Sequence, residues 1–168
     1  MSAAREFLAR YRVRLGFAAT LVALWLSRPT IGSVAIGAAV ACAGEALRIW
    51  AAGHLEKGSE VTASGPYRLT RHPLYVGSAM MGLGFAIASN SLWTAAIAAA
   101  YLSLTIGAAI GREEQHLTEK FGPAYPEYRE GRLDAARRFS AARAVRNREY
   151  RAAAGVAAVL ALLLWKAL

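Results

Sequence analysis

The sequence predicts an all-α integral membrane protein, a single-domain helical bundle with about five transmembrane helices. The first reason is composition, because 56 % of the 168 residues are hydrophobic although the formal net charge is +9. The second reason is that the apolar residues form five segments near the length of a bilayer-spanning helix. The third is that all four tryptophans lie at segment ends, as in an interfacial aromatic belt. Nucleic-acid-binding proteins are basic but less apolar, so we expect a lipid bilayer and no nucleic acid as partner.

Each of the five segments is expected to cross the bilayer. The first is short, so Tyr11, Arg12 and Arg14 must extend toward the headgroups at its start. No good cleavage site follows it, so we expect it to remain part of the protein. A soluble helix bundle would need polar residues at helical spacing, which the fourth segment lacks. The segments are 13–26, 31–50, 73–89, 92–111 and 152–168.

The distribution of positive charge predicts the orientation. If the N-terminus is cytoplasmic, 18 of the 20 Lys and Arg residues lie on the cytoplasmic side, and Arg28 and Lys166 lie opposite. This asymmetry follows the positive-inside rule, and it places the C-terminus on the opposite side. Because the outer loops are very short, the functional site is expected to face the cytoplasm. The small size and short loops are typical of a bacterial protein, hence of the inner membrane.

A charged pair lies inside the second segment, in the stretch "GEALR". Glu45 and Arg48 are three residues apart, so they share one helix face and can pair. Charges at this depth are costly and usually line a functional cavity. The alternative is that both side chains extend to the cytoplasmic surface. Glutamate is short and does this poorly, which favours a functional role.

The stretch "GPYRLTRHPLYVG" begins the third segment and indicates a ligand site. Pro73 suits the first turn of a helix, which makes His72 the N-cap and directs unbonded N–H groups at the cytoplasm. Such a helix start binds anions. Cations and aromatic rings flank it: Tyr67, Arg68, Arg71 and Tyr75. The alternative is that the arginines contact lipid phosphates and the tyrosines join the aromatic belt.

Small residues follow in the same predicted helix. They are Gly77, Ser78, Ala79, Gly82 and Gly84. Small side chains let the backbones of two membrane helices approach closely. We therefore expect the helix over 73–89 to pack tightly against a neighbour.

Two glutamates follow the fourth segment. Glu113 and Glu114 are expected to continue its helix into the cytoplasm until Gly122 ends it. Paired carboxylates can bind ribose hydroxyls or an ammonium group, or they are simply the solvated end of a helix. The three histidines show no metal-ligand spacing and Cys42 is the only cysteine, so we expect no metal site.

The stretch 131–151 is basic. Leu133, Phe139 and Val145 give it an apolar side, so we expect an amphipathic segment on anionic lipid, without a chemical role.

The motifs "GEALR", "SGPYRLTRHPLYVG" and "REEQHLTEKFGPAYPEY" occur in this order. Together they resemble the isoprenylcysteine carboxyl methyltransferase family of membrane enzymes, with phospholipid N-methyltransferases as more distant relatives. The resemblance implies a methyltransferase-like core over about 40–130. The basic stretch 131–151 and the span 152–168 are additions, because the family's eukaryotic members end soon after the last motif.

The resemblance also implies S-adenosylmethionine as cofactor and S-adenosylhomocysteine as product. The cofactor's carboxylate suits a helix N-terminus, its sulfonium suits aromatic faces, and its ribose or amine suits a glutamate. Val61 and Thr62 match the family better than the two residues before them. Carried over position by position, the cofactor contacts are Ser59, Glu60, Val61, Thr62, Tyr67, His72, Pro73, Leu74, Tyr75 and Glu113.

The acceptor is expected to be a lipophilic small molecule or a lipid-modified group, methylated by resemblance on a carboxylate. Ala109 stands where eukaryotic members have a substrate-binding arginine, so Arg48 and Arg112 are the candidates for substrate binding. An amine or hydroxyl acceptor needs a general base, for which Glu45 is the candidate, beside Arg48 as the second catalytic residue. Two alternatives stay open: a phospholipid or amine N-methyltransferase, and a non-catalytic membrane subunit.

Overall fold

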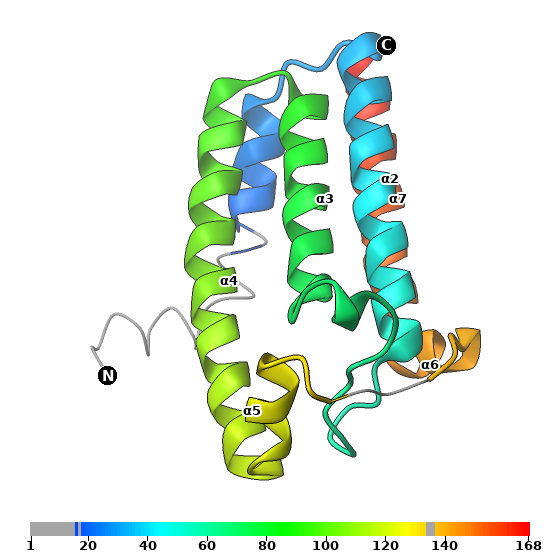
Figure 1. Ribbon diagram of the computed structural model, residues 1–168. Coiled ribbons are helices and arrows are strands. Elements are labelled where there is room, and N and C mark those ends of the chain that lie inside the picture. Colours follow the sequence, from blue (N-terminus) through cyan, green and yellow to red (C-terminus); the bar gives the residue numbers. More distant parts are fainter. Residues whose placement is uncertain (1–15, 17, 134–136) are drawn as a thin grey trace.

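The structure, a computed structural model, describes residue 16, residues 18–133 and residues 137–168. These residues form helices and loops and contain no strand, which confirms the all-α prediction. A helix through 18–26 precedes the labelled elements, and the long helices stand side by side in one bundle (Figure 1). The elements are α2 (Ile31–His54), η1 (Gly65–Arg68), α3 (Pro73–Ser89), α4 (Leu92–Phe121), α5 (Ala124–Arg129), α6 (Ala141–Arg146) and α7 (Tyr150–Ala167).

The long helices follow the predicted segments closely. Helices α2, α4 and α7 are long and apolar enough to cross a membrane, and α3 is a shorter apolar helix. Helix α3 has the predicted bounds, and α4 continues past the membrane segment until Gly122, as expected. Helix α2 runs on to His54, four residues beyond the predicted end. Residues 13–15 and 17 of the first segment, with the arginines before it, lie outside the described part of the chain.

Helices α2 and α3 pack backbone against backbone, as the small residues predicted. A Cβ atom on Gly44 would lie 2.7 Å from the carbonyl oxygen of Gly77. One on Gly84 would lie 2.6 Å from the carbonyl oxygen of Gly37. Real Cβ atoms do not approach this closely, so glycine is required at both crossings. The crossings fix α3, and the site residues at its start, against α2.

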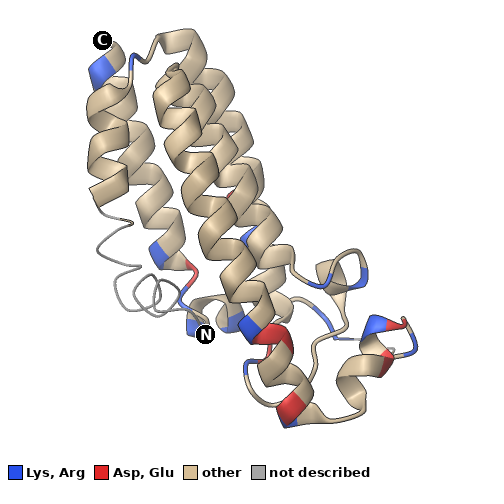
Figure 2. Ribbon diagram, turned by 90° about the vertical axis from the view of Figure 1, so that its left-hand side faces the viewer, with Lys and Arg blue, Asp and Glu red and all other residues tan. Residues whose placement is uncertain are grey.

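The two ends of the bundle differ in charge. Charged residues gather at the end that carries η1, α5 and α6, which we call the polar end (Figure 2). At the opposite end Lys166 Nζ donates to the carbonyl oxygens of Leu24 (2.7 Å) and Trp25 (3.1 Å), joining α7 to the helix before α2. The side chains of Trp25, Trp93 and Trp165 are exposed, as residues of an aromatic belt would be. The cytoplasmic location of the polar end stays a prediction.

A small apolar core lies beneath the bundle at the polar end. Its buried members come from α2, the loop after it, η1 and α5: Ala51, Val61, Ala63, Tyr67, Tyr125 and Tyr128. The Tyr128 hydroxyl donates to the Tyr67 carbonyl oxygen at 2.7 Å, which joins α5 to η1. This core holds the loop between α2 and α3 against the end of α4.

The basic stretch contains only one short helix, α6, among its described residues. Leu133 packs against the core at the polar end, and half-exposed Phe139 lies against Gly53 at the end of α2. Val145 is exposed. Two of the three side chains expected to face lipid therefore contact protein, and lipid contact of the stretch remains a prediction.

Candidate active site

The start of α3 has the predicted geometry, with Pro73 as its first residue and His72 as its N-cap. The N–H groups of Tyr75 and Val76 both donate to the His72 carbonyl oxygen, at 3.0 and 3.1 Å. Among the described residues, the N–H of Leu74 has no backbone acceptor. The helix start therefore offers one donor rather than the several that were expected.

The His72 side chain contacts the end of α4. Its Nε2 atom lies 3.2 Å from Glu114 Oε1, and Arg71 Nη1 lies 3.1 Å from the same oxygen. The His72 and Tyr75 rings lie 5.9 Å apart between centroids. Glu114 thus connects the motif that contains Arg71 and His72 with the motif at the end of α4, although only Glu113 was assigned to the cofactor. Adjacent helical residues point about 100° apart, and the sequence did not show which of the two would face α3.

Glu113 is exposed, but its negative charge affects the pKa of Tyr67 in η1. Burial first, and then the Glu113 charge, raise the pKa of the Tyr67 hydroxyl well above its usual range. Burial and the neighbouring Glu114 carboxylate likewise raise the pKa of Tyr125. Both hydroxyl groups therefore stay protonated around neutral pH. The structure brings the two glutamates and Tyr67 to one region at the polar end.

The predicted cofactor loop divides into an inner and an outer part. Val61 and Thr62 are buried, and Thr62 Oγ1 accepts a hydrogen bond from the Glu56 N–H at 3.3 Å. Ser59 is exposed, and Glu60 pairs with Arg137 (Nη2–Oε1 2.7 Å). Contact of these four residues with a cofactor stays a prediction.

A cavity of about 1200 Å³ runs along the bundle between the helix through 18–26, α3, α4 and α7. Ligand pockets are usually about 300–1,000 Å³, so this space is large. Its walls are mostly small or apolar, and Ala109 is one of them. Polar side chains line it toward the polar end: Tyr75, Ser78, Arg112 and Gln115. Of the two predicted substrate-binding residues, Arg112 lines the cavity and Arg48 does not.

Arg48 joins three helices behind the cavity wall. Its Nη1 atom donates to Ser78 Oγ at 2.6 Å and to the Leu74 carbonyl oxygen at 3.3 Å, both in α3. Its Nε and Nη2 atoms each lie 2.6 Å from Oε1 of Glu149, the residue before α7. No sequence pattern indicates this partner, which lies 101 positions away.

Glu45 is buried beside this cluster, with 6 % of its surface exposed. Its Oε2 atom lies 3.8 Å from Arg48 Nε. Neither carboxylate oxygen has a hydrogen-bond partner among the described residues. The predicted pair therefore forms, but Glu45 does not line the cavity. Nowhere in the described ranges do three His, Cys, Asp or Glu side chains gather as a metal site.

Comparisons with known proteins identify relatives of this chain. A model of the phospholipid methyltransferase family matches residues 12–124. The nickel-cobalt-cadmium resistance protein NccN of Alcaligenes xylosoxydans xylosoxydans is 31 % identical over 138 residues, which are 73 % of this chain and 63 % of that protein. The cobalt-zinc-cadmium resistance protein CzcN of Cupriavidus metallidurans is 33 % identical over 106 residues, 62 % of this chain and 47 % of that protein.

The chain thus spans between about half and two thirds of the length of these relatives. No solved structure matches it. From the motifs, phospholipid methyltransferases were expected to be the more distant relatives, yet theirs is the family that matches. The assignment to the isoprenylcysteine carboxyl methyltransferases is not confirmed. Because the family model covers more than half of the sequence, including α2, α3 and α4, the chain belongs to the phospholipid methyltransferase family.

Proposed function

We propose that this protein transfers a methyl group from S-adenosylmethionine to a lipid or another lipophilic acceptor in the membrane. The cavity is the observation that carries the proposal. Its apolar walls follow the membrane helices, and its polar end holds Tyr75 and Arg112. A lipophilic acceptor and a polar cofactor can therefore meet at one place.

The residues around the start of α3 fit the cofactor. Its carboxylate suits the Leu74 N–H and the positive charge of Arg71, because helix starts attract anions. Its sulfonium suits the ring face of Tyr75. Its ribose or amine suits Glu113 and Glu114. When bound, the cofactor supplies an activated methyl group, and these residues orient it and exclude water.

The acceptor occupies the apolar part of the cavity in this proposal. Arg112 lies at the polar end and would bind an anionic group of the acceptor, a phosphate or a carboxylate. Arg48 touches only Ser78 of the cavity wall, and Glu45 does not line the cavity. We therefore propose that Arg48 and Glu45 position α3 rather than contact the acceptor. The relatives' names refer to metal resistance, and methylation of a membrane component is compatible with such a role.

The first experiment is a titration of S-adenosylhomocysteine into the full-length protein in detergent. We expect saturable binding that His72→Ala combined with Tyr75→Ala weakens at least tenfold. The control is His116→Ala combined with Tyr150→Ala, which changes the same residue types at exposed positions. Absence of saturable binding by the native protein would contradict the proposal.

The second experiment identifies the acceptor bond. The protein is incubated with membrane lipid extract and cofactor labelled in its methyl group. Label that mild base releases comes from a methyl ester, and label that survives mild base comes from an N-methyl or O-methyl group. Absence of any labelled lipid-soluble product, despite cofactor binding, would favour the non-catalytic alternative.

A further inference from the structure

The end of α2 is capped by a segment that lies about 90 positions later in the chain. Helix ends leave carbonyl oxygens without intrahelical donors. Here Asn147 Nδ2 donates to the carbonyl oxygens of Ala52 (2.8 Å) and Leu55 (2.9 Å). The Gly53 carbonyl oxygen accepts from Arg143 Nη1 at 2.5 Å and from the Ser140 N–H at 3.1 Å. The segment 137–147 is therefore held against α2 by hydrogen bonds to the backbone carbonyl oxygens at the end of that helix.

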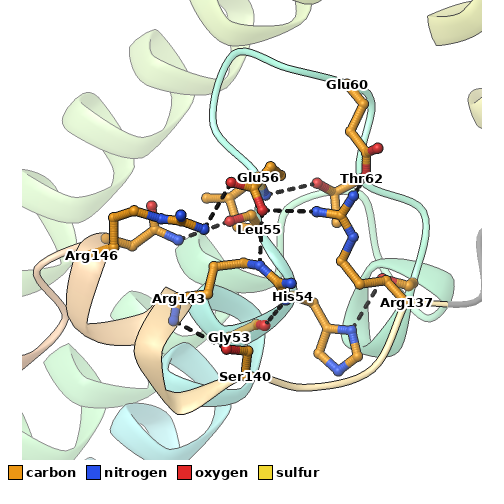
Figure 3. A network of polar contacts seen from close by, with 12 residues as sticks. Gly53, His54, Leu55, Glu56, Glu60, Thr62, Arg137, Ser140, Arg143 and Arg146 are labelled. Carbon is orange, nitrogen blue, oxygen red and sulfur yellow. Dashed lines mark hydrogen bonds and ion pairs between the residues drawn. The ribbon is translucent and has the colours of Figure 1, made fainter.

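The same segment surrounds one carboxylate, that of Glu56 (Figure 3). Its Oε2 atom accepts from Arg137 Nη1 at 3.0 Å and from Arg143 Nε at 2.9 Å. Its Oε1 atom accepts from Arg146 Nη2 at 2.9 Å. The side chains of Glu56 and Arg143 are mostly buried, at 26 % and 16 % exposure, so solvent screens this cluster less than a surface ion pair.

These contacts hold both ends of the loop that carries the predicted cofactor residues. Glu56 begins the loop, and its N–H donates to Thr62 Oγ1 near the other end. Arg137 bridges Glu56 and Glu60: its Nη1 atom lies 3.0 Å from Glu56 Oε2, and its Nη2 atom lies 2.7 Å from Glu60 Oε1. The loop between these anchors contains Val61, whose side chain is buried in the core at the polar end.

We propose that the segment 137–147 fixes this loop for cofactor binding, with Glu56 as the positioning residue. The proposal rests on the proposed function, because it assumes that the loop contacts the cofactor. The family model ends at residue 124, so the segment 137–147 lies outside the matched region, whereas Glu56 and the loop lie inside it. Without the Glu56 charge Arg137, Arg143 and Arg146 lose the partner that they share, and their repulsion weakens the hold of the segment on the loop, although Arg137 keeps its pair with Glu60 and Arg146 is exposed.

The test compares Glu56→Gln with Glu130→Gln in the full-length protein. Glu130 also pairs with an arginine, Arg132, but both side chains are exposed, so it is a matched control. We expect Glu56→Gln to raise the dissociation constant of S-adenosylhomocysteine about tenfold with an unchanged number of sites. Amide hydrogen exchange should become faster over residues 57–62, and Glu130→Gln should change neither quantity.

A second variant separates loop positioning from capping of α2. Arg137→Gln removes the contacts to Glu56 and Glu60 but keeps the hydrogen bonds of Arg143 and Asn147 to α2. We expect it to increase exchange over 57–62 and to weaken binding about threefold while the thermal midpoint stays near that of the control. This variant decides the question if Glu56→Gln does not fold.

The outcomes distinguish the two proposals. If the native protein does not bind S-adenosylhomocysteine, the proposed function fails, and hydrogen exchange alone decides whether the segment fixes the loop. If exchange over 57–62 is the same in Arg137→Gln and in the control, the positioning proposal is overturned. Faster exchange with unchanged affinity also overturns it, because the loop would then not limit cofactor binding.

Discussion

Replacement of Arg48 by methionine tests whether this side chain holds the membrane helices together. Methionine keeps most of the apolar stem and removes the guanidinium group. Five contacts are lost: two to Glu149 Oε1, one to Glu45 Oε2, one to Ser78 Oγ and one to the Leu74 carbonyl oxygen. The carboxylates of Glu149 and Glu45, each on a side chain that is only 8 % exposed, then lose the cation that both of them contact.

The structure sets the expected size of the effect. Removal of one partner of a buried ion pair costs about 3–5 kcal/mol. Because a fifth of the Arg48 side chain is exposed, we expect the lower part of this range, about 3 kcal/mol. Glu149→Gln leaves Arg48 its contacts to α3 and should cost about 1–2 kcal/mol. For a chain of this size 1 kcal/mol lowers the thermal midpoint by about 2–4 °C, so Arg48→Met should lower it by about 6–12 °C.

The assay is thermal unfolding of the detergent-purified protein, with Arg132→Met as control. Arg132 belongs to an exposed pair, whose loss should cost less than about 1 kcal/mol. The double variant Arg48→Met with Glu149→Gln should be less destabilised than the sum of the single effects, because the two residues share one interaction. An Arg48→Met midpoint equal to that of Arg132→Met would refute the reasoning.

Two further predictions concern packing and pH. In Gly77→Leu a Cβ atom would lie 2.7 Å from the Gly44 carbonyl oxygen and 2.5 Å from Arg48 Cγ, so we expect about 1–3 kcal/mol of destabilisation from overpacking. A Cβ atom on Gly107 would have no neighbour within 4 Å, so the control Gly107→Leu should leave the thermal midpoint nearly unchanged. Equal thermal midpoints of Gly77→Leu and Gly107→Leu would contradict the close crossing of α2 and α3. Burial raises the pKa of Tyr128 to about 12, above the unfolded value of about 10, so the folded state holds this proton more tightly. Stability should therefore fall as pH rises from about 10 to about 12, and less steeply in Tyr128→Phe; equal slopes in a thermal-midpoint series would disprove this.

The sequence predicted those parts of the fold that local chemistry determines. Pro73 begins α3 where the first helical turn needs no N–H donor. Gly122 ends α4 with a positive φ of 52°, a conformation that glycine adopts readily. Each of these signals is read from one or two neighbouring residues.

The polar contacts of the site could not be predicted in the same way. Arg48 and Glu149, or Glu56 and its arginines, are 81 to 101 positions apart, and no periodic pattern connects them. The extension of α2 to His54 has the same origin, because its last carbonyl oxygens are capped by the distant segment. The motifs therefore located the region of the site, and the tertiary structure determined which carboxylates face it.

The remote capping of α2 also bears on how the protein is made. The donors to the last α2 carbonyl oxygens lie 87 to 95 residues after them, so they leave the ribosome later. At roughly 5–20 residues per second the delay is about 5–20 s. During this interval the earlier helices can enter the bilayer, but the loop after α2 lacks its anchors. Synthesis of the segment 137–147 thus completes the polar end of the molecule, and a chain interrupted before residue 137 would carry the family's motifs without the contacts that cap α2 and anchor this loop.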